Sequence, residues 1–233
     1  GAMMDELSAA LETIAGDRSL KAVAVTAGGK AFCAGADVGE HGPDQVADMI
    51  ASFGRLFRRL DALEIPVVMA VGGAAMGAGF ELILMADILL AAADATFGQP
   101  EIRLGFFAPV GVAYLPALVG PAKAMEITCT GRTYSAAEMQ ACGFVSQVVP
   151  DERQLNNALH KVLDDLRQAD GSLESQLRID MDREAAVVED PEIALPLGPG
   201  LPLGSGDHRD QQAQHDVEVV RGLGVEHDRG EAP

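Results

Sequence analysis

The sequence predicts an α/β fold in which strands alternate with helices. Residues 21–27 (KAVAVTA) alternate β-branched with small residues, as a strand does, and residues 65–71 (IPVVMAV) are an apolar run typical of a strand buried on both faces. Between them, apolar residues recur every three or four positions over 44–63, which indicates an amphipathic helix. Ligand-binding loops of such folds lie at the carboxyl ends of the strands. Function is therefore expected in residues 28–42 and 72–81.

The remaining elements follow from the same two periodicities and from glycine and proline positions. We expect helices at 7–14, from near residue 80, at 121–130, 135–142 and 153–168, and strands at 88–97 and 144–150.

Composition narrows the class of function. The chain has 233 residues, 48% of them apolar, and a net charge of −18. A surface this acidic repels phosphate backbones and anionic lipid, which argues against nucleic-acid and membrane partners. Apolar runs are interrupted before they reach the length of a membrane span. Three cysteines without metal-ligand spacing fit a reducing compartment, so we expect a cytoplasmic protein without a metal site.

The chain divides into four parts by composition. Residues 1–3 are interpreted as a tag remnant, and residues 4–152 as the core. Residues 153–190 are expected to be a helical segment. Residues 191–233 are rich in proline and glycine and have no sustained period, so they are expected to form an irregular or disordered tail.

Two loops, FCAGAD (32–37) and MGAGFE (76–81), are built from small residues that let a ligand approach backbone N–H groups. A pair of such donors suits a developing oxyanion. A dinucleotide site is disfavoured because the second loop lacks the third glycine of that motif, and no Gly-Lys-Ser/Thr of a phosphate-binding loop follows. The alternative is that both loops are plain tight turns.

Glu81 and Glu101 are the candidate acid–base residues. Each follows a strand and a loop, so both carboxylates can reach one cleft. Two glutamates on one water can divide general base and general acid work, with burial and mutual repulsion raising one pKa toward neutrality. The alternative is that Glu81 supports a helix dipole while Glu101 is solvated in a loop.

Four segments, KAFCAGAD, PVVMAVGGAAMGAGFELILMAD, ATFGQPEIRLG and GPAKAMEITCTGRTYSAAEMQACGFVSQVVP, resemble in order the enoyl-CoA hydratase/isomerase (crotonase) family, over about two-thirds of the chain. The resemblance implies a crotonase-like spiral of ββα repeats that assembles as a homotrimer or a dimer of trimers. An acyl-CoA thioester would be the substrate, and no cofactor would be needed.

The resemblance also implies residue roles. The backbone N–H groups of Ala36 and Ala78 would hold the thioester oxygen, and Glu81 and Glu101 match the two catalytic glutamates. Keeping both favours hydration over isomerisation. The positions that match those lining coenzyme A are Lys30 and Ala34.

Within the family, FCAGADVGEH and LGFFAPVGVAYLP (104–116) are most similar to cyclohexa-1,5-diene-1-carbonyl-CoA hydratases. An acyl pocket remodelled there would accept a ring, with His41, Phe107, Pro109 and Tyr114 as its candidate lining. The alternatives are that His41 is a solvated loop residue and that 106–114 is only a repacked turn. Cys33 is interpreted as a small packing residue rather than a nucleophile.

The chain departs from the family at both ends. The N-terminal β-hairpin is missing, and residues 171–233 do not resemble the helices that complete the trimer and cover coenzyme A. We hypothesise a shift of the coding frame between about residues 170 and 195, since propensity and pattern agree before it and not after it. The rival to an enzyme is a non-catalytic crotonase-like assembly or binding protein.

Overall fold

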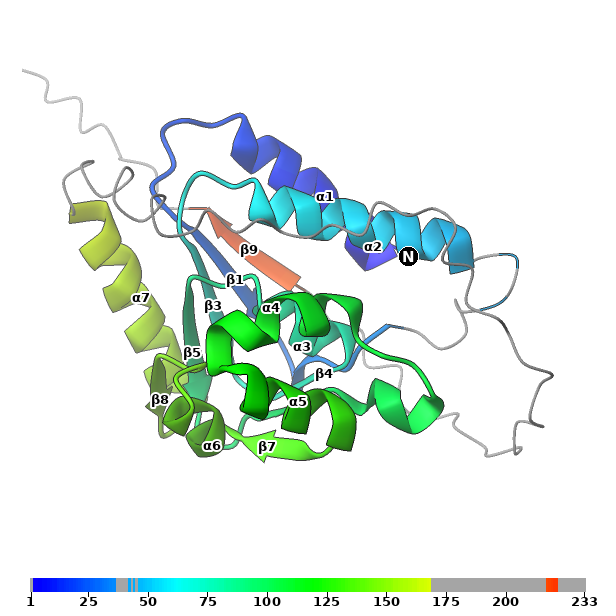
Figure 1. Cartoon of the computed structure of the whole chain (residues 1–233). Coiled ribbons are helices and arrows are strands. Elements are labelled where there is room, and N and C mark those ends of the chain that lie inside the picture. Colours follow the sequence, from blue (N-terminus) through cyan, green and yellow to red (C-terminus); the bar gives the residue numbers. More distant parts are fainter. Residues whose placement is uncertain (1, 37–41, 43, 45, 169–216, 222–233) are drawn as a thin grey trace, which may run out of the picture.

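The computed structural model describes residues 2–36, 42, 44, 46–168 and 217–221. The larger of its two sheets has five strands in the order β8-β5-β3-β1-β9 (Figure 1). Its strands are β1 (Val23–Ala27), β3 (Val67–Val71), β5 (Ile88–Ala92), β8 (Gln147–Val149) and β9 (Val217–Arg221). The first four are parallel, and β9 runs antiparallel along β1.

A smaller sheet lies beside it, with the order β2-β4-β6-β7. Its strands are β2 (Ala31–Cys33), β4 (Ala74–Met76), β6 (Thr96–Gly98) and β7 (Thr133–Ser135). Each of β1, β3 and β5 is followed in the chain by a strand of this second sheet and then by a helix. The expected spiral of ββα repeats is therefore confirmed.

Helices cover both faces of the larger sheet (Figure 1). On one face, α1 (Ala2–Ala15) and α2 (Val46–Asp61) lie side by side, and Arg59 of α2 pairs with Glu12 of α1. On the other face, α7 (Glu152–Gln168) packs against β3 and β5. Successive side chains of a strand point to opposite faces of the sheet, so the larger sheet packs against helices on both faces. Val23 of β1 faces α1 and α2, whereas Ala24 faces α7.

The remaining helices follow the two central repeats. They are α3 (Ala78–Ile83), the 3-10 helix η2 (Pro100–Leu104), α4 (Pro109–Val119), α5 (Pro121–Thr130) and α6 (Ala136–Ala141). Proline stands first in η2, α4 and α5, where its missing N–H leaves no intrahelical bond unmade. None of the described helices is long and apolar enough to cross a membrane.

Three local expectations are corrected. The loops 28–42 and 72–81 contain β2 and β4, which are too short and too rich in small residues to show a period. The strand expected at 88–97 is two strands, β5 and β6, in different sheets, because the chain turns at Ala93 and Asp94.

Regular elements lie in both terminal segments of the described chain. Helix α1 begins at Ala2, within the segment interpreted as a tag remnant, and Met3 packs against the core. Val217–Arg221, within the segment expected to be irregular, forms β9, which pairs antiparallel with β1 and is the edge strand of the larger sheet. Residues 169–216, which include the hypothesised frame shift and the end of the helical segment, lie outside the described residues.

Candidate active site

The two loops of small residues meet at the carboxyl ends of β2 and β4. A Cβ added at Gly35 would lie 3.2 Å from the carbonyl oxygen of Met76 and 3.8 Å from the amide nitrogen of Ala78. A Cβ at Gly79 would lie 2.4 Å from the carbonyl oxygen of Cys33. Glycine at both positions is therefore required for this close approach. It brings the backbone around Ala36 next to the start of α3.

Gly77 sets the direction in which α3 begins. Its backbone has φ 55° and ψ −125°, a conformation open to glycine and strained for other residues. Its N–H donates to the carbonyl oxygen of Gly98, at 2.9 Å. Ala78 is the first residue of α3, so its N–H has no acceptor within the helix.

Glu81 is the only buried charged residue of the described core, with 3% of its surface exposed. It lies on the first turn of α3. Its Oε1 accepts hydrogen bonds from the N–H groups of Val110, at 2.8 Å, and Gly111, at 3.1 Å. These donors belong to the first turn of α4, which begins at Pro109. The start of one helix therefore holds a carboxylate carried by another.

Sequence reasoning missed this pair of donors. It assigned the stretch 104–116 to the acyl pocket and did not predict that its backbone would bind Glu81. A proline at the first position of a helix, preceded by the turn residue Gly105, was the available signal. A backbone N–H donor is not indicated by the type of its side chain, so the sequence gives little sign of it.

Glu101 approaches the same place from the other side. It lies on η2, and a Cβ added at Gly77 would be 3.0 Å from its Oε1. Its carboxylate therefore lies against the backbone of the second loop, at the start of α3. Its Oε2 is buried and has no hydrogen-bond partner in the described part of the chain.

The two carboxylates titrate as neighbours. Burial raises the pKa of Glu81 to about 7; the N–H of Gly111 opposes this rise, and the negative charge of Glu101 adds to it. Burial likewise raises the pKa of Glu101. Among the described residues, the ion pairs do not include either glutamate. The negative charge of Glu101 therefore favours the protonated form of Glu81, in addition to the larger effect of burial.

The other predicted site residues are less closely placed. Lys30 and Ala34 are exposed in the first loop region, residues 28–42. Phe107, which precedes α4, and Pro109, its first residue, are also exposed. Tyr114 is half-buried and its hydroxyl donates to Asp61 on α2, at 3.3 Å, rather than to either glutamate. His41 lies outside the described residues.

Cys33 behaves as the sequence analysis expected of a packing residue. It is buried at the end of β2, and burial raises the pKa of its thiol, which keeps the thiolate fraction low. Among the described residues, no group of three or more His, Cys, Asp or Glu side chains is placed to hold a metal ion.

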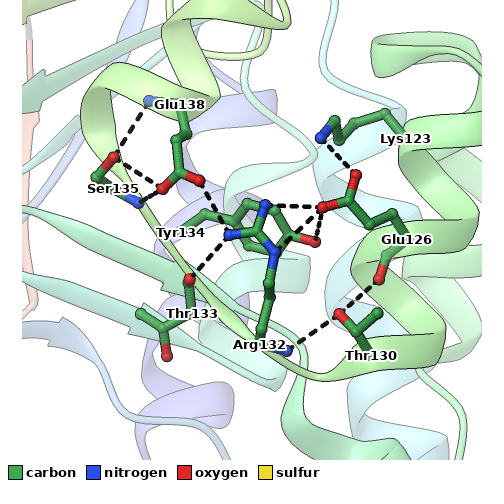
Figure 2. Close-up of polar contacts among 8 residues, drawn as sticks. All are labelled: Lys123, Glu126, Thr130, Arg132, Thr133, Tyr134, Ser135 and Glu138. Carbon is green, nitrogen blue, oxygen red and sulfur yellow. Dashed lines mark hydrogen bonds and ion pairs between the residues drawn. The ribbon is translucent and has the colours of Figure 1, made fainter.

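A surface cluster of charges supports the segment that carries Glu101. Arg132 lies over the ring of Tyr134, with 3.6 Å from the guanidinium carbon to the ring centroid, and bonds Glu126 and Glu138 at 2.7 Å and 2.9 Å (Figure 2). We call these residues, with Lys123, the Arg132 cluster. The cluster joins α5, β7 and α6. Strand β7 pairs with β6 through Gly98, whose carbonyl holds Gly77 in place.

The fold is that of the enoyl-CoA hydratase/isomerase family. The family model of that description matches residues 1–194, and the chain belongs to this family. It is 41% identical over 158 residues to a probable enoyl-CoA hydratase of Mycobacterium tuberculosis, which covers 67% of this chain and 62% of that protein. It is also 41% identical over 133 residues to the cyclohexa-1,5-dienecarbonyl-CoA hydratase of Thauera aromatica, over 57% of this chain and 52% of that one.

Solved structures agree with these relatives. The enoyl-CoA hydratase of Bacillus anthracis superimposes with a TM-score of 0.69 at 30% identity, covering 77% of this chain and 78% of that one. The chain spans about three-fifths of the length of the curated enoyl-CoA hydratases that it matches.

Proposed function

We propose that the protein is an acyl-CoA hydratase that adds water to the α,β-double bond of an unsaturated acyl-CoA thioester. The observation that carries this proposal is the buried Glu81 together with Glu101, whose Oε2 is buried, next to two loops of small residues that approach each other closely. Hydration needs a base that takes a proton from water and an acid that gives a proton to carbon, and two carboxyl groups can supply both.

The proposed reaction balances within the pair. One glutamate takes a proton from water while the water oxygen bonds to the β-carbon. The electron pair of the double bond moves toward the thioester, whose oxygen becomes an enolate. The N–H groups of Ala36 and Ala78 stabilise that charge, the second of them from the start of α3. The other glutamate then gives its proton to the α-carbon, and the pair ends with the same number of protons.

The proposed coenzyme A contacts are on the rim. Lys30 is exposed at the edge of the first loop, where its ammonium can reach a phosphate, and the exposed Ala34 leaves room for the flat adenine. We propose a homotrimer or a dimer of trimers as the assembly, and no resident cofactor.

The acyl group is the finer part of the proposal. We propose that a cyclic dienoyl thioester is accepted, because relatives at similar identity are named for different acyl groups and the stretch before α4 exposes apolar surface. Phe106 is 48% exposed and Phe107 56% exposed, close in the chain to the N–H groups that bind Glu81. This apolar surface is proposed to form the wall of the acyl pocket, together with His41, Pro109 and Tyr114.

The first experiment is a direct comparison of crotonyl-CoA with cyclohexa-1,5-diene-1-carbonyl-CoA. Turnover of either supports a hydratase, and a preference for the ring supports the finer proposal. Calorimetric binding of acyl-CoA without turnover of either would instead support a non-catalytic binding protein. Migration of the double bond without hydration would support an isomerase.

The second experiment removes one oxyanion donor. Ala78→Pro deletes a backbone N–H at the first position of a helix, where proline is tolerated, and Gly77 has no Cβ to clash with the new ring. The hydration rate is expected to fall about 10² to 10³-fold. Glu152→Pro, at the first position of the remote α7, is the matched control and should leave the rate unchanged. An equally active Ala78→Pro variant would remove this residue from the mechanism.

A further inference from the structure

Gln99 is a buried polar residue to which the proposed reaction assigns no part. It stands immediately before η2, two residues ahead of Glu101, and 1% of its surface is exposed. Its Oε1 and Nε2 atoms are both buried and have no hydrogen-bond partner in the described part of the chain. A buried side-chain amide that no protein group bonds has hydrogen-bonding capacity left for water or a ligand.

The amide lies directly beside the glutamate pair. A Cβ added at Gly111 would fall 2.0 Å from Oε1 of Gln99, so the side chain rests against the Cα of that glycine. The N–H of the same residue donates to Glu81. Gln99 and Glu81 therefore meet at Gly111, one touching its Cα and the other its N–H.

The unpartnered atoms have a definite chemical complement. They comprise the donor and the acceptor of the Gln99 amide and one oxygen of the Glu101 carboxylate, on a segment of three residues. A water molecule, which both donates and accepts two hydrogen bonds, matches this set, as does the hydroxyl group that water becomes after addition.

We propose that Gln99 is a third polar group of the reaction's water site, where its amide binds the water that adds to the double bond. The inference rests on the proposed hydration. It makes Gln99 a catalytic residue that touches a reacting atom, and it explains why an amide is kept where an apolar side chain would fit at lower cost.

The test exchanges the amide for an apolar side chain of the same length. Gln99→Met is expected to lower kcat for hydration at least about tenfold, the effect of losing one hydrogen bond in the transition state, with KM for the thioester within about threefold. Its Tm is expected to remain close to that of the wild type, because Met has the same length and needs no hydrogen-bond partner. Gln140→Met, on the exposed face of α6, is the control and should leave kcat unchanged.

Each other outcome is decisive. A Gln99→Met variant whose Tm falls so far that the loss of kcat reflects unfolded protein would make the amide a structural residue, which overturns the inference. A variant that hydrates as fast as an active wild type also overturns it while leaving the proposed function intact. A wild type that hydrates no thioester refutes the proposed function, and the inference with it.

Discussion

Two pairs of glutamates differ in their environments, which shift their pKa values in opposite directions. Glu81 is buried and Glu101 is half-buried, and burial raises the pKa of each. Glu126 and Glu138 of the Arg132 cluster are at the surface. Hydrogen bonds from Lys123 and then Arg132 lower the pKa of Glu126 to about 2, and the N–H of Ser135 and then Arg132 do the same for Glu138.

The comparison shows that the surroundings assign the role of a carboxylate. A buried glutamate without a neighbouring cation has a raised pKa, so it keeps its proton to a higher pH than a solvated glutamate does, which suits proton transfer near neutral pH. A glutamate bound to a guanidinium is permanently charged and serves to fix geometry. Glu126 and Glu138, which are the ion-paired glutamates, lie in the Arg132 cluster, next to the strands that lead to Glu101.

The largest expected effect is on rate. Glu81→Gln keeps the shape and the hydrogen bonds from Val110 and Gly111 but removes the proton-transfer group, so hydration of crotonyl-CoA should fall about 10² to 10⁴-fold. Glu138→Gln removes a carboxylate from the Arg132 cluster and should change the rate by less than about threefold. The hydration rate is measured at saturating substrate. Equal losses of rate in the two variants would contradict the assignment of proton transfer to the Glu81 pair alone.

The second prediction concerns the pH dependence of the free energy of unfolding. The pKa of Glu81 is about 7 in the folded protein and 4.5 as its ordinary value, so the folded state binds the proton more tightly. Its contribution is fully present below pH 4.5 and is lost as the pH rises through 7, by about 3 kcal/mol. Glu81→Gln should therefore gain about that much relative to the wild type between pH 4 and pH 8, measured by urea unfolding.

Glu138→Gln is the control for the pH dependence of the free energy of unfolding, and its effect is expected to have the opposite sign. Its carboxylate has a pKa of about 2 in the folded protein, so its contribution is present above pH 4.5 and is lost as the pH falls through 2. The variant should be less stable than the wild type at pH 8 and should converge with it in acid. A parallel response of Glu81→Gln and Glu138→Gln would contradict the assignment of two environments.

A smaller effect is expected for Arg132→Lys. Lysine keeps the charge but loses the planar fork that binds Glu126 and Glu138 together and the stack on Tyr134. We expect Tm to fall by about 2–4 °C. Arg55→Lys on α2, where the guanidinium bonds Ser52, is the control in the same thermal scan and should shift Tm by less than half as much.

The smallest effect is expected for Lys123→Met. Its ammonium pairs with Glu126 at 2.6 Å in the exposed i, i+3 arrangement, which water and salt screen. Tm should fall by about 1 °C or less, and the difference should vanish in about 1 M salt. A difference that persists in salt would indicate a packing role for the lysine stem.

Much of the fold could be predicted because its elements repeat a period. The helix over 44–63 and the strand over 65–71 appear in the structure as α2 and β3, since burial of one face or of both imposes a visible pattern. Strands β2 and β4 could not be predicted, because three residues of mostly small side chains carry no period. That Glu81 and Glu101 serve one cleft stays a prediction, supported by the effect of the Glu101 charge on the pKa of Glu81.

The sequence by itself determined the α/β class, the alternation of the longer strands with helices and which residues carry titratable groups near the loops, because these depend on local periodicity and residue type. Only the tertiary structure decided that Val110 and Gly111 hold Glu81, that Gln99 is buried with no hydrogen-bond partner in the described part of the chain, and that Val217–Arg221 lies along β1. Those facts depend on burial and on contacts between segments far apart in the chain. Every residue except proline has the same backbone N–H group. The hydrogen-bond partner of such a group therefore depends on the folded position of the backbone and cannot be identified from residue type.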